Sequence, residues 1–152
     1  MQSLRVLRLL TAVSVMTFAP TSLSAEEPMS AEKAHAEMKE MFGGVPSLFQ
    51  VYPKSAIGAG WALMKSTDLN KNTALTVKVR ELIALGVAAQ IPCDYCIYYH
   101  TKAAAAQGAS EEEIREAVHM SSLVRHWSTV LQGNQYDLDA FKAETDAAFK
   151  TE

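Results

Sequence analysis

The two cysteines of the chain, Cys93 and Cys96, are three residues apart and follow directly on Pro92. A proline just before them suits the start of a helix, so both thiols are predicted to lie in its first turn. Exposed backbone N–H groups and the helix dipole stabilise a thiolate there. The spacing also brings both side chains onto one face, within reach of a disulfide. His100 lies one turn beyond Cys96 on this face, and its imidazole can accept a thiol proton directly or through water.

Glu81 is the fourth residue with a candidate role in this chemistry. No charged residue occurs from Leu82 to Pro92, and at helical spacing Glu81 shares a face with Leu85 and Ala88. A carboxylate on such an apolar face is usually paired or protonated, because burying a bare charge is costly. Glu81 is therefore either a general base or proton relay for the thiols, or one half of a structural salt bridge with a nearby arginine or lysine.

Other interpretations of the cysteine pair are weaker. A structural disulfide across two residues closes a very small loop and removes little unfolded-state entropy. Zinc prefers four ligands, and Cys93, Cys96 and His100 supply three, so a zinc site stays as an alternative. A c-type haem site needs a histidine directly after the second cysteine, where the chain has Ile97. Thioredoxin uses a βαβ scaffold that this sequence does not show. We therefore expect a redox-active pair with no cofactor and no metal.

The elements that must position these residues are predicted to be helices throughout. No run of alternating apolar and polar residues indicates a strand, so the fold class is all-α. Ser30 is a predicted N-cap, Ser110 to Glu113 form a capping box, and Gly108 stands where a helix end favours positive φ. The predicted helices span residues 30–41, 54–66, 74–90, 93–107, 110–131 and 137–149, with a short apolar segment at 45–52.

Length and composition limit the class of protein further. A chain of 152 residues with 49% hydrophobic and 20% charged residues is typical of one globular domain. The formal net charge of −3 argues against nucleic acid as a partner, since nucleic-acid binders usually carry a basic face. Two cysteines are too few for a disulfide-rich scaffold.

Residues 1–25 are predicted to be a cleaved secretory signal. Arg5 and Arg8 precede an apolar run from Leu9 to Ala19, and small residues up to Ala25 follow. The run is short for a membrane anchor, which needs ~20 residues, and we expect no membrane contact. Cleavage leaves residues 26–152, 127 of the 152 residues, as a single domain with 12 basic and 17 acidic residues. We expect this domain in the periplasm or outside the cell, where thiols meet an oxidising compartment.

The C-terminal part of the chain carries weaker signals. His119 and His126 are predicted to lie on a solvated or subunit-facing surface, without a catalytic role. Trp127 shares a helical face with apolar neighbours and is predicted to lie in the core or in an interface. Those neighbours are Met120, Leu123 and Val130.

The register of Glu81, Cys93-x-x-Cys96 and His100 resembles that of the carboxymuconolactone decarboxylase-like superfamily, in its AhpD-like (alkylhydroperoxidase) branch. The flanking sequences are similar too, and the likeness covers roughly residues 42–131. The similar flanking sequences are Gly44 to Phe49, Arg80 to Leu85, and Ala103 to Gly108 followed by Ser110. The resemblance implies a compact helical domain that assembles into trimers or hexamers, with the active site near a subunit interface.

The same resemblance implies a peroxidase that reduces hydrogen or organic peroxides and draws electrons from a thiol reductant. Cys96 would be the peroxidatic thiolate, Cys93 the resolving thiol, and Glu81 with His100 the proton relay. The characterised alkylhydroperoxidases have a histidine where this chain has Tyr95. A tyrosine cannot take up a proton near neutral pH, so thiol–disulfide exchange with weak peroxidase activity is an alternative. A non-redox lactone decarboxylase-like or binding protein is a third.

Overall fold

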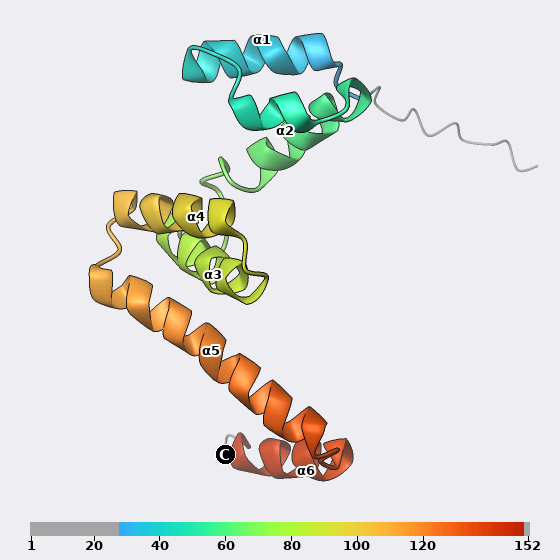
Figure 1. The fold of residues 1–152 in the computed structure, drawn as a ribbon, viewed down its shortest axis with the longest axis vertical. Coiled ribbons are helices and arrows are strands. Elements are labelled where there is room, and N and C mark those ends of the chain that lie inside the picture. Colours follow the sequence, from blue (N-terminus) through green and yellow to red (C-terminus); the bar gives the residue numbers. More distant parts are fainter. Residues whose placement is uncertain (1–27, 151–152) are drawn as a thin grey trace, which may run out of the picture. The chain divides into compact units, whose positions relative to one another are not determined.

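The computed structural model describes residues 28–150, and every regular element within them is a helix (Figure 1). The all-α prediction is thus confirmed. The predicted signal, residues 1–25, lies outside the described residues. None of the described helices is long and apolar enough to cross a bilayer. The α-helices are α1 (Ala31–Phe42), α2 (Ile57–Ser66), α3 (Val77–Gln90), α4 (Asp94–Ala106), α5 (Glu111–Gly133) and α6 (Leu138–Ala148), and the 3₁₀ helices are η1 (Ser47–Val51) and η2 (Lys54–Ala56).

The chain divides into two compact units, and the boundary falls inside α2, between Ala59 and Gly60. In the first unit, Ser30 caps α1 as predicted, because its Oγ accepts the N–H of Lys33 at 3.2 Å. η2 packs on α1, and Lys54 forms an exposed ion pair with Glu32 at 2.8 Å. Gly58 packs against the backbone of Met29, where a β-carbon would collide with the carbonyl group. Close packing therefore explains this helical glycine.

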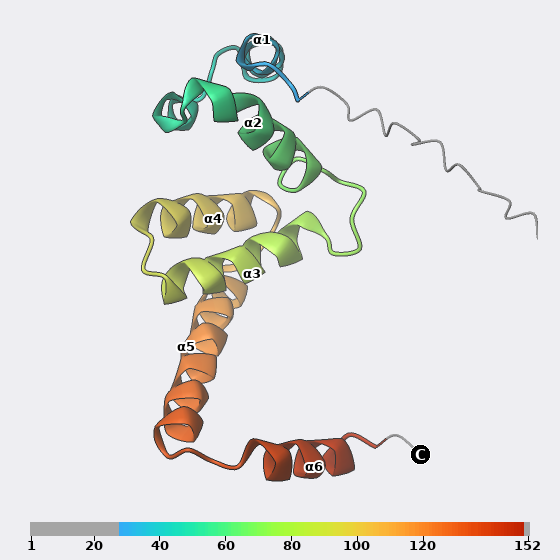
Figure 2. The same cartoon turned by 90° about the vertical axis from the view of Figure 1, so that its right-hand side faces the viewer.

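The second unit holds the cysteine pair, and α3 is its centre. α3 lies alongside α4 and crosses α5 (Figures 1 and 2). Leu85 and Ala88 of α3 and Ala104 of α4 are buried. At Gly86 a β-carbon would sit 3.4 Å from the carbonyl oxygen of Ala117, so α3 and α5 approach closely at this glycine. Lys78 of α3 also pairs with Glu113 of α5 at 2.7 Å.

Helix boundaries in this unit follow local hydrogen bonding. α3 begins at Val77 rather than at residue 74, because the Thr76 side chain accepts the N–H of Val79 and acts as the N-cap. The capping box at Ser110 is confirmed. Its Oγ accepts the N–H of Glu113 at 3.1 Å, and the Glu113 carboxylate accepts the N–H of Ser110 at 2.7 Å. Gly108 has φ 82°, as its predicted place after α4 requires.

The exposure of the side chains in the distal part of α5 differs from what the sequence predicted. Trp127 is 53% exposed and Met120 54% exposed, so the core placement is wrong for the single chain. The physical reason is that α3 contacts α5 around Gly86 and Ala117, and α5 continues well beyond that crossing. An interface role for this face stays a prediction. His119 and His126 are exposed, as expected for a solvated or subunit-facing surface.

Candidate functional site

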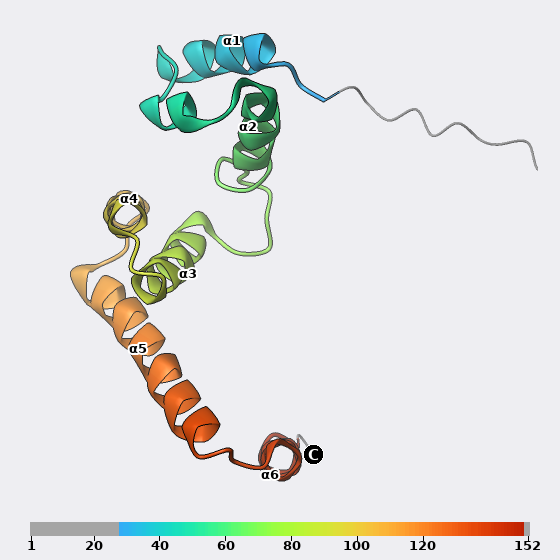
Figure 3. The same ribbon diagram turned by 45° about the vertical axis from the view of Figure 1, so that its right-hand side comes forward.

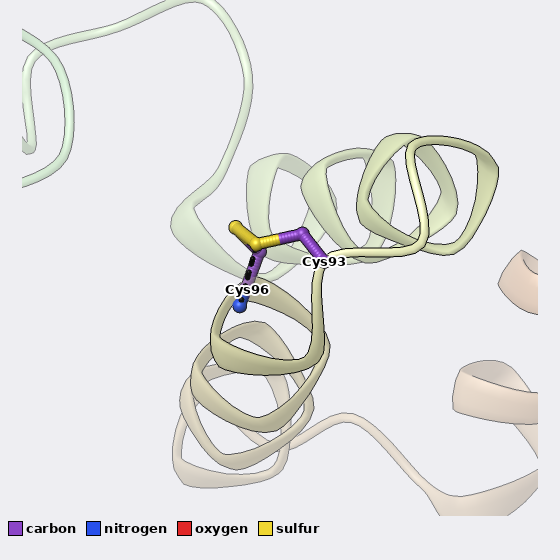
Figure 4. The surroundings of a disulfide bond; sticks show 2 residues. All are labelled: Cys93 and Cys96. Carbon is purple, nitrogen blue, oxygen red and sulfur yellow. Dashed lines mark hydrogen bonds between the residues drawn. A yellow bond between two sulfur atoms is a disulfide. The ribbon is translucent and has the colours of Figure 1, made fainter.

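The cysteine pair forms a disulfide at the start of α4 (Figure 4). The two Cα atoms are 5.3 Å apart, and both side chains are half-buried. Cys96 lies in the first helical turn, as predicted. Cys93 lies one residue before the helix and is its N-cap, which corrects the prediction that both lie inside the first turn. The short connection from α3 and the start of α4 thus fix both sulfurs at one helix end.

The N-cap position gives Cys93 a hydrogen-bond donor. Its Sγ accepts the backbone N–H of Cys96 at 3.3 Å, the contact that a serine or aspartate oxygen makes at other helix starts (Figure 4). In the reduced protein such a donor, with the positive end of the helix dipole, favours a thiolate. Helix geometry therefore supports reactivity at Cys93 as well as at Cys96.

Glu81 of α3 and His100 of α4 form a close pair. Nδ1 of His100 lies 2.7 Å from Oε2 of Glu81. Because an ionised carboxylate can only accept, the tautomer that fits this contact has its N–H on Nδ1. Glu81 is 8% exposed and lies beside buried Leu85 and Ala88, as its helical spacing predicts. Among the described residues the carboxylate of Glu81 is thus paired with His100 and not with Lys78 or Arg80, and its role as a proton relay stays a prediction. The two basic side chains near Glu81 in the sequence have other partners. Lys78 binds Glu113, and Arg80 binds backbone carbonyls.

The pairing fixes what His100 can do. With Nδ1–H bound to Glu81, Nε2 is the ring nitrogen that remains to exchange a proton. His100 and Cys96 are both in α4, four residues apart, and so lie on one face of the helix. The structure thus joins the four residues that the sequence singled out into two pairs, the Cys93–Cys96 disulfide and the Glu81–His100 contact, and the two pairs lie one helical turn apart on α4.

Tyr99 is a neighbour of this pair that the sequence did not single out. Its ring meets the His100 ring edge-on, with centroids 5.1 Å apart. Partial burial raises the pKa of the Tyr99 hydroxyl above its usual value, and the nearby carboxylates of Glu81 and Asp68 raise it further. Tyr99 therefore stays neutral beside the imidazole. Its adjacency to His100 in the sequence was the one available signal.

Arg80 anchors the segment that carries Asp68. Its guanidinium donates to the carbonyl of Thr67 and, at 2.7 Å, to the carbonyl of Asn70. These bonds tie the turn after α2 to the residue before Glu81. Arg80 is thus a structural neighbour of the relay, and no sequence pattern indicated this role because its partners are backbone groups.

Two further observations describe the surroundings of the disulfide. Tyr95 is 90% exposed, so the side chain that replaces the histidine of alkylhydroperoxidases points to solvent. Among residues 28–150, no three His, Cys, Asp or Glu side chains gather as they would around a metal ion.

The fold and the pair define a class: small all-helical proteins with a Cys-x-x-Cys disulfide at a helix start. The sequence model of the carboxymuconolactone decarboxylase family matches residues 56–136, more than half of the chain. The chain belongs to this family.

Two relatives and one solved structure are also similar to this chain. An uncharacterized protein of Cupriavidus necator is 33% identical over 82 residues, 54% of this chain and 67% of that protein. An uncharacterized protein encoded in the cox locus of Paracoccus denitrificans is 34% identical over 62 residues, 41% of this chain. The match spans only 56% of the Paracoccus protein's length. The alkylhydroperoxidase AhpD core from Rhodospirillum rubrum has a similar fold, with a TM-score of 0.62, 22% identity, and coverage of 73% of this chain and 85% of that one. The AhpD-like fold is thereby confirmed.

Proposed function

We propose that this protein is a thiol-dependent peroxidase that reduces hydrogen or organic peroxides through the Cys93–Cys96 pair. The observation that carries the proposal is the 2.7 Å contact between Glu81 and His100, made one helical turn from Cys96. A carboxylate that orients an imidazole beside a thiol is the arrangement that activates sulfur nucleophiles. The AhpD-like fold supports the same chemistry, since the similar Rhodospirillum rubrum protein is described as an alkylhydroperoxidase.

The first chemical step consumes the peroxide. His100 takes the proton of the Cys96 thiol through Nε2, and Glu81 stabilises the imidazolium that forms. The Cys96 thiolate attacks one peroxide oxygen, and the O–O bond breaks. Cys96 becomes a sulfenic acid, and the other oxygen leaves as water or alcohol after it receives the proton from His100. Sulfur is oxidised by two electrons and the peroxide is reduced by two.

The second step closes the disulfide. The Cys93 thiolate, favoured by the N–H of Cys96, attacks the sulfenic sulfur. The sulfur–oxygen bond breaks, the departing hydroxide takes up the proton that the Cys93 thiol has lost, and water leaves as the disulfide seen in the structure forms. A thiol reductant then returns both cysteines to thiols by exchange and is itself oxidised to a disulfide. No cofactor is needed for this cycle.

The setting that we propose is antioxidant defence in the periplasm or outside the cell. This proposal rests on the secretory signal expected in residues 1–25 and on the redox-active cysteine pair. A separate thiol reductant would have to regenerate that pair.

One observation favours a second candidate function, thiol–disulfide exchange with weak peroxidase activity. Tyr95 occupies the position of the additional histidine and is 90% exposed. The site therefore has one imidazole for proton transfer rather than two. The N-cap position of Cys93 is equally suited to exchange, because a stabilised thiolate is a good leaving group.

The experiment that tests the proposal is to trap the first intermediate. In Cys93→Ser, one equivalent of peroxide should convert Cys96 to a sulfenic acid, detected by mass spectrometry after reaction with dimedone. In the matched variant Cys96→Ser, the dimedone adduct should form at Cys93 much more slowly than it forms at Cys96 in Cys93→Ser. Equal labelling of both variants, or none in either, would overturn the assignment of Cys96 as the peroxidatic thiol.

A further inference from the structure

Tyr99 is a side chain beside the cysteine site to which the chemistry proposed above gives no role. It is one of three tyrosines in α4, and their exposure differs. Tyr95 is 90% exposed and Tyr98 71%, whereas Tyr99 is 48% exposed. The ring of Tyr98 has Lys102 as its neighbour, with Nζ 5.9 Å from the ring centroid. Tyr99 is thus the tyrosine of α4 that the fold covers most.

The ring of Tyr99 is turned toward His100. Consecutive side chains of an α-helix point about 100° apart, so neighbours in the sequence do not ordinarily face each other. The rings of Tyr99 and His100 nevertheless have centroids 5.1 Å apart, and their planes meet at 86°. This perpendicular arrangement is one of the two that aromatic pairs prefer. The contact is therefore a specific packing of one ring on the other.

The hydroxyl of Tyr99 lies near two carboxylates that the fold holds in place. Partial burial raises the pKa of Tyr99 most, and the carboxylates of Glu81 and Asp68 raise it further. Asp68 is held because Arg80 binds backbone carbonyls before and after it. Glu81 is held by α3, which packs against α4 in all three views (Figure 3). The Tyr99 side chain thus lies between fixed neighbours and the imidazole of His100.

One hydrogen bond alone does not fix an imidazole ring. The 2.7 Å contact with Glu81 holds Nδ1 of His100, but the side-chain torsions still let the ring swing about that point. Nε2, the nitrogen that would exchange a proton with Cys96, lies across the ring from this contact. A second contact, made perpendicular to the ring by a packed side chain, removes the remaining freedom. Tyr99 makes such a contact.

The Glu81–His100 pair also needs cover from water. The side chain of Glu81 is 10% exposed, whereas that of His100 is 23% exposed. Water that reaches either group competes for their hydrogen bond, because each can then bond to solvent instead. The ring of Tyr99 lies against His100, which is the more exposed member of the pair.

We propose that Tyr99 is a positioning residue, whose ring sets the plane of the His100 imidazole and keeps water from the Glu81–His100 hydrogen bond. Tyr99 acts through His100 and exchanges no proton itself. The inference rests on the proposed function, in which Nε2 of His100 takes the proton of Cys96. Its structural part needs no peroxide chemistry and is tested without it.

Proton exchange at His100 tests this structural part in the disulfide form of the full chain. NMR of protein labelled with ¹⁵N in histidine follows the Nδ1–H proton, which exchanges slowly with water while its hydrogen bond is covered. Tyr99→Leu keeps apolar bulk and a good helix former but has no ring. Exchange should become about 3- to 10-fold faster, the factor that corresponds to losing one aromatic pair. Tyr99→Phe keeps the ring and should keep the wild-type rate, as should the matched control Tyr98→Leu.

Four results would overturn the proposal. The first is an Nδ1–H proton that exchanges too fast to be seen in wild type, and the second is equal exchange in wild type and Tyr99→Leu. The third is a Tyr99→Phe variant as fast as Tyr99→Leu, which would assign the effect to the hydroxyl. The fourth is backbone amides of α4 that speed up by the same factor, because a general loosening of the helix would then explain the change.

Peroxide kinetics separate this inference from the proposed function. Oxidation of Cys96 by peroxide should be about 3- to 10-fold slower in Tyr99→Leu, in step with the exchange rate, and unchanged in Tyr99→Phe. A wild type that does not react with peroxide overturns the proposed function, and proton exchange then decides on Tyr99 by itself. An active wild type and a Tyr99→Leu variant that oxidise at the same rate overturn the positioning role.

Discussion

The carboxylate of Glu81 lies 2.7 Å from Nδ1 of His100, and this contact joins the middle of α3 to α4 one turn beyond Cys96. Glu81 is nearly buried, so the carboxylate has little solvent to replace the imidazole as a partner. The contact orients the ring and leaves Nε2 as the nitrogen for proton transfer. The chemistry proposed for the cysteine pair therefore depends on two residues from different helices.

Glu81→Gln tests the charge of this carboxylate. An amide of the same shape can still contact His100, but it does not stabilise an imidazolium. We expect the rate of Cys96 oxidation by peroxide to fall about 10- to 100-fold, because a positioned acid–base group contributes roughly 10²- to 10⁴-fold and this variant keeps the imidazole itself. The alkylation profile of the reduced protein against pH should also move to higher pH. Glu113→Gln, a carboxylate of α5 outside the site, is the control. A profile equal to that of wild type would remove Glu81 from the relay.

His100→Ala tests the pair as a structural unit. It leaves the buried Glu81 carboxylate without its partner, and the unfolding free energy should fall by about 1–3 kcal/mol. Adding Glu81→Gln to this variant should recover part of the loss, because the unpaired charge is then gone. Chemical denaturation of the two single variants and the double variant measures the coupling, with exposed His119→Ala as control. Additive losses would show that the two side chains do not act together.

Tyr99→Phe tests the environment beside His100. Burial and the carboxylates of Glu81 and Asp68 raise the Tyr99 pKa, so the folded state holds the phenolic proton more tightly than the unfolded state. The resulting stability is present below about pH 10, the ordinary tyrosine value, and is lost as pH rises through the raised pKa. Wild type should therefore lose more stability than Tyr99→Phe above pH 10 in thermal melts. Exposed Tyr98→Phe should follow wild type. Parallel alkaline profiles for wild type and Tyr99→Phe would contradict this account.

Glu113→Gln tests the link between α3 and α5. Lys78, and then the N–H of Ser110, lower the pKa of Glu113, so its ionised form stabilises the folded state. This stability is present above the ordinary glutamate value of 4.5 and is lost as pH falls through the lowered pKa. The variant should melt at a lower temperature than wild type at pH 7. The two proteins should converge as the pH falls below the lowered pKa. A difference that stays constant as the pH falls from 7 into the acid range would show that the substitution acts through packing instead of charge.

Local sequence signals predicted most of the helical fold. Ser30, Ser110 and Gly108 act through residues at most four positions away, so capping rules were sufficient for them. The start of α3 was missed by three residues, because the apolar run was followed back to residue 74 although Thr76 is the favoured N-cap residue. Cys93 was placed inside the helix because Pro92 was taken as the residue before the first turn, whereas Cys93 itself is the N-cap.

Contacts between distant residues set the limit of prediction at the site. Helical spacing showed that Glu81 lies on a buried face, but its partner is 19 residues away on another helix. The resemblance to a family with the same register linked them, and the structure brings them together. Neither a sequence pattern nor the resemblance predicted the hydrogen bonds of Arg80 or the ion pair of Lys78 with Glu113. Trp127 was predicted to lie in the core or in an interface, and only the core alternative is wrong, because an apolar helical face has the same sequence pattern whether its own chain or another one covers it.

Stopped-flow consumption of hydrogen peroxide by the reduced protein tests the central claim most directly. Wild type should consume peroxide rapidly in a single turnover and form the Cys93–Cys96 disulfide, and a dithiol donor should sustain further turnovers. Cys96→Ser should lose the rapid phase, whereas Cys93→Ser should keep it for one equivalent and then stop. If wild type and Cys96→Ser consume peroxide equally slowly, the protein is not a peroxidase of this kind.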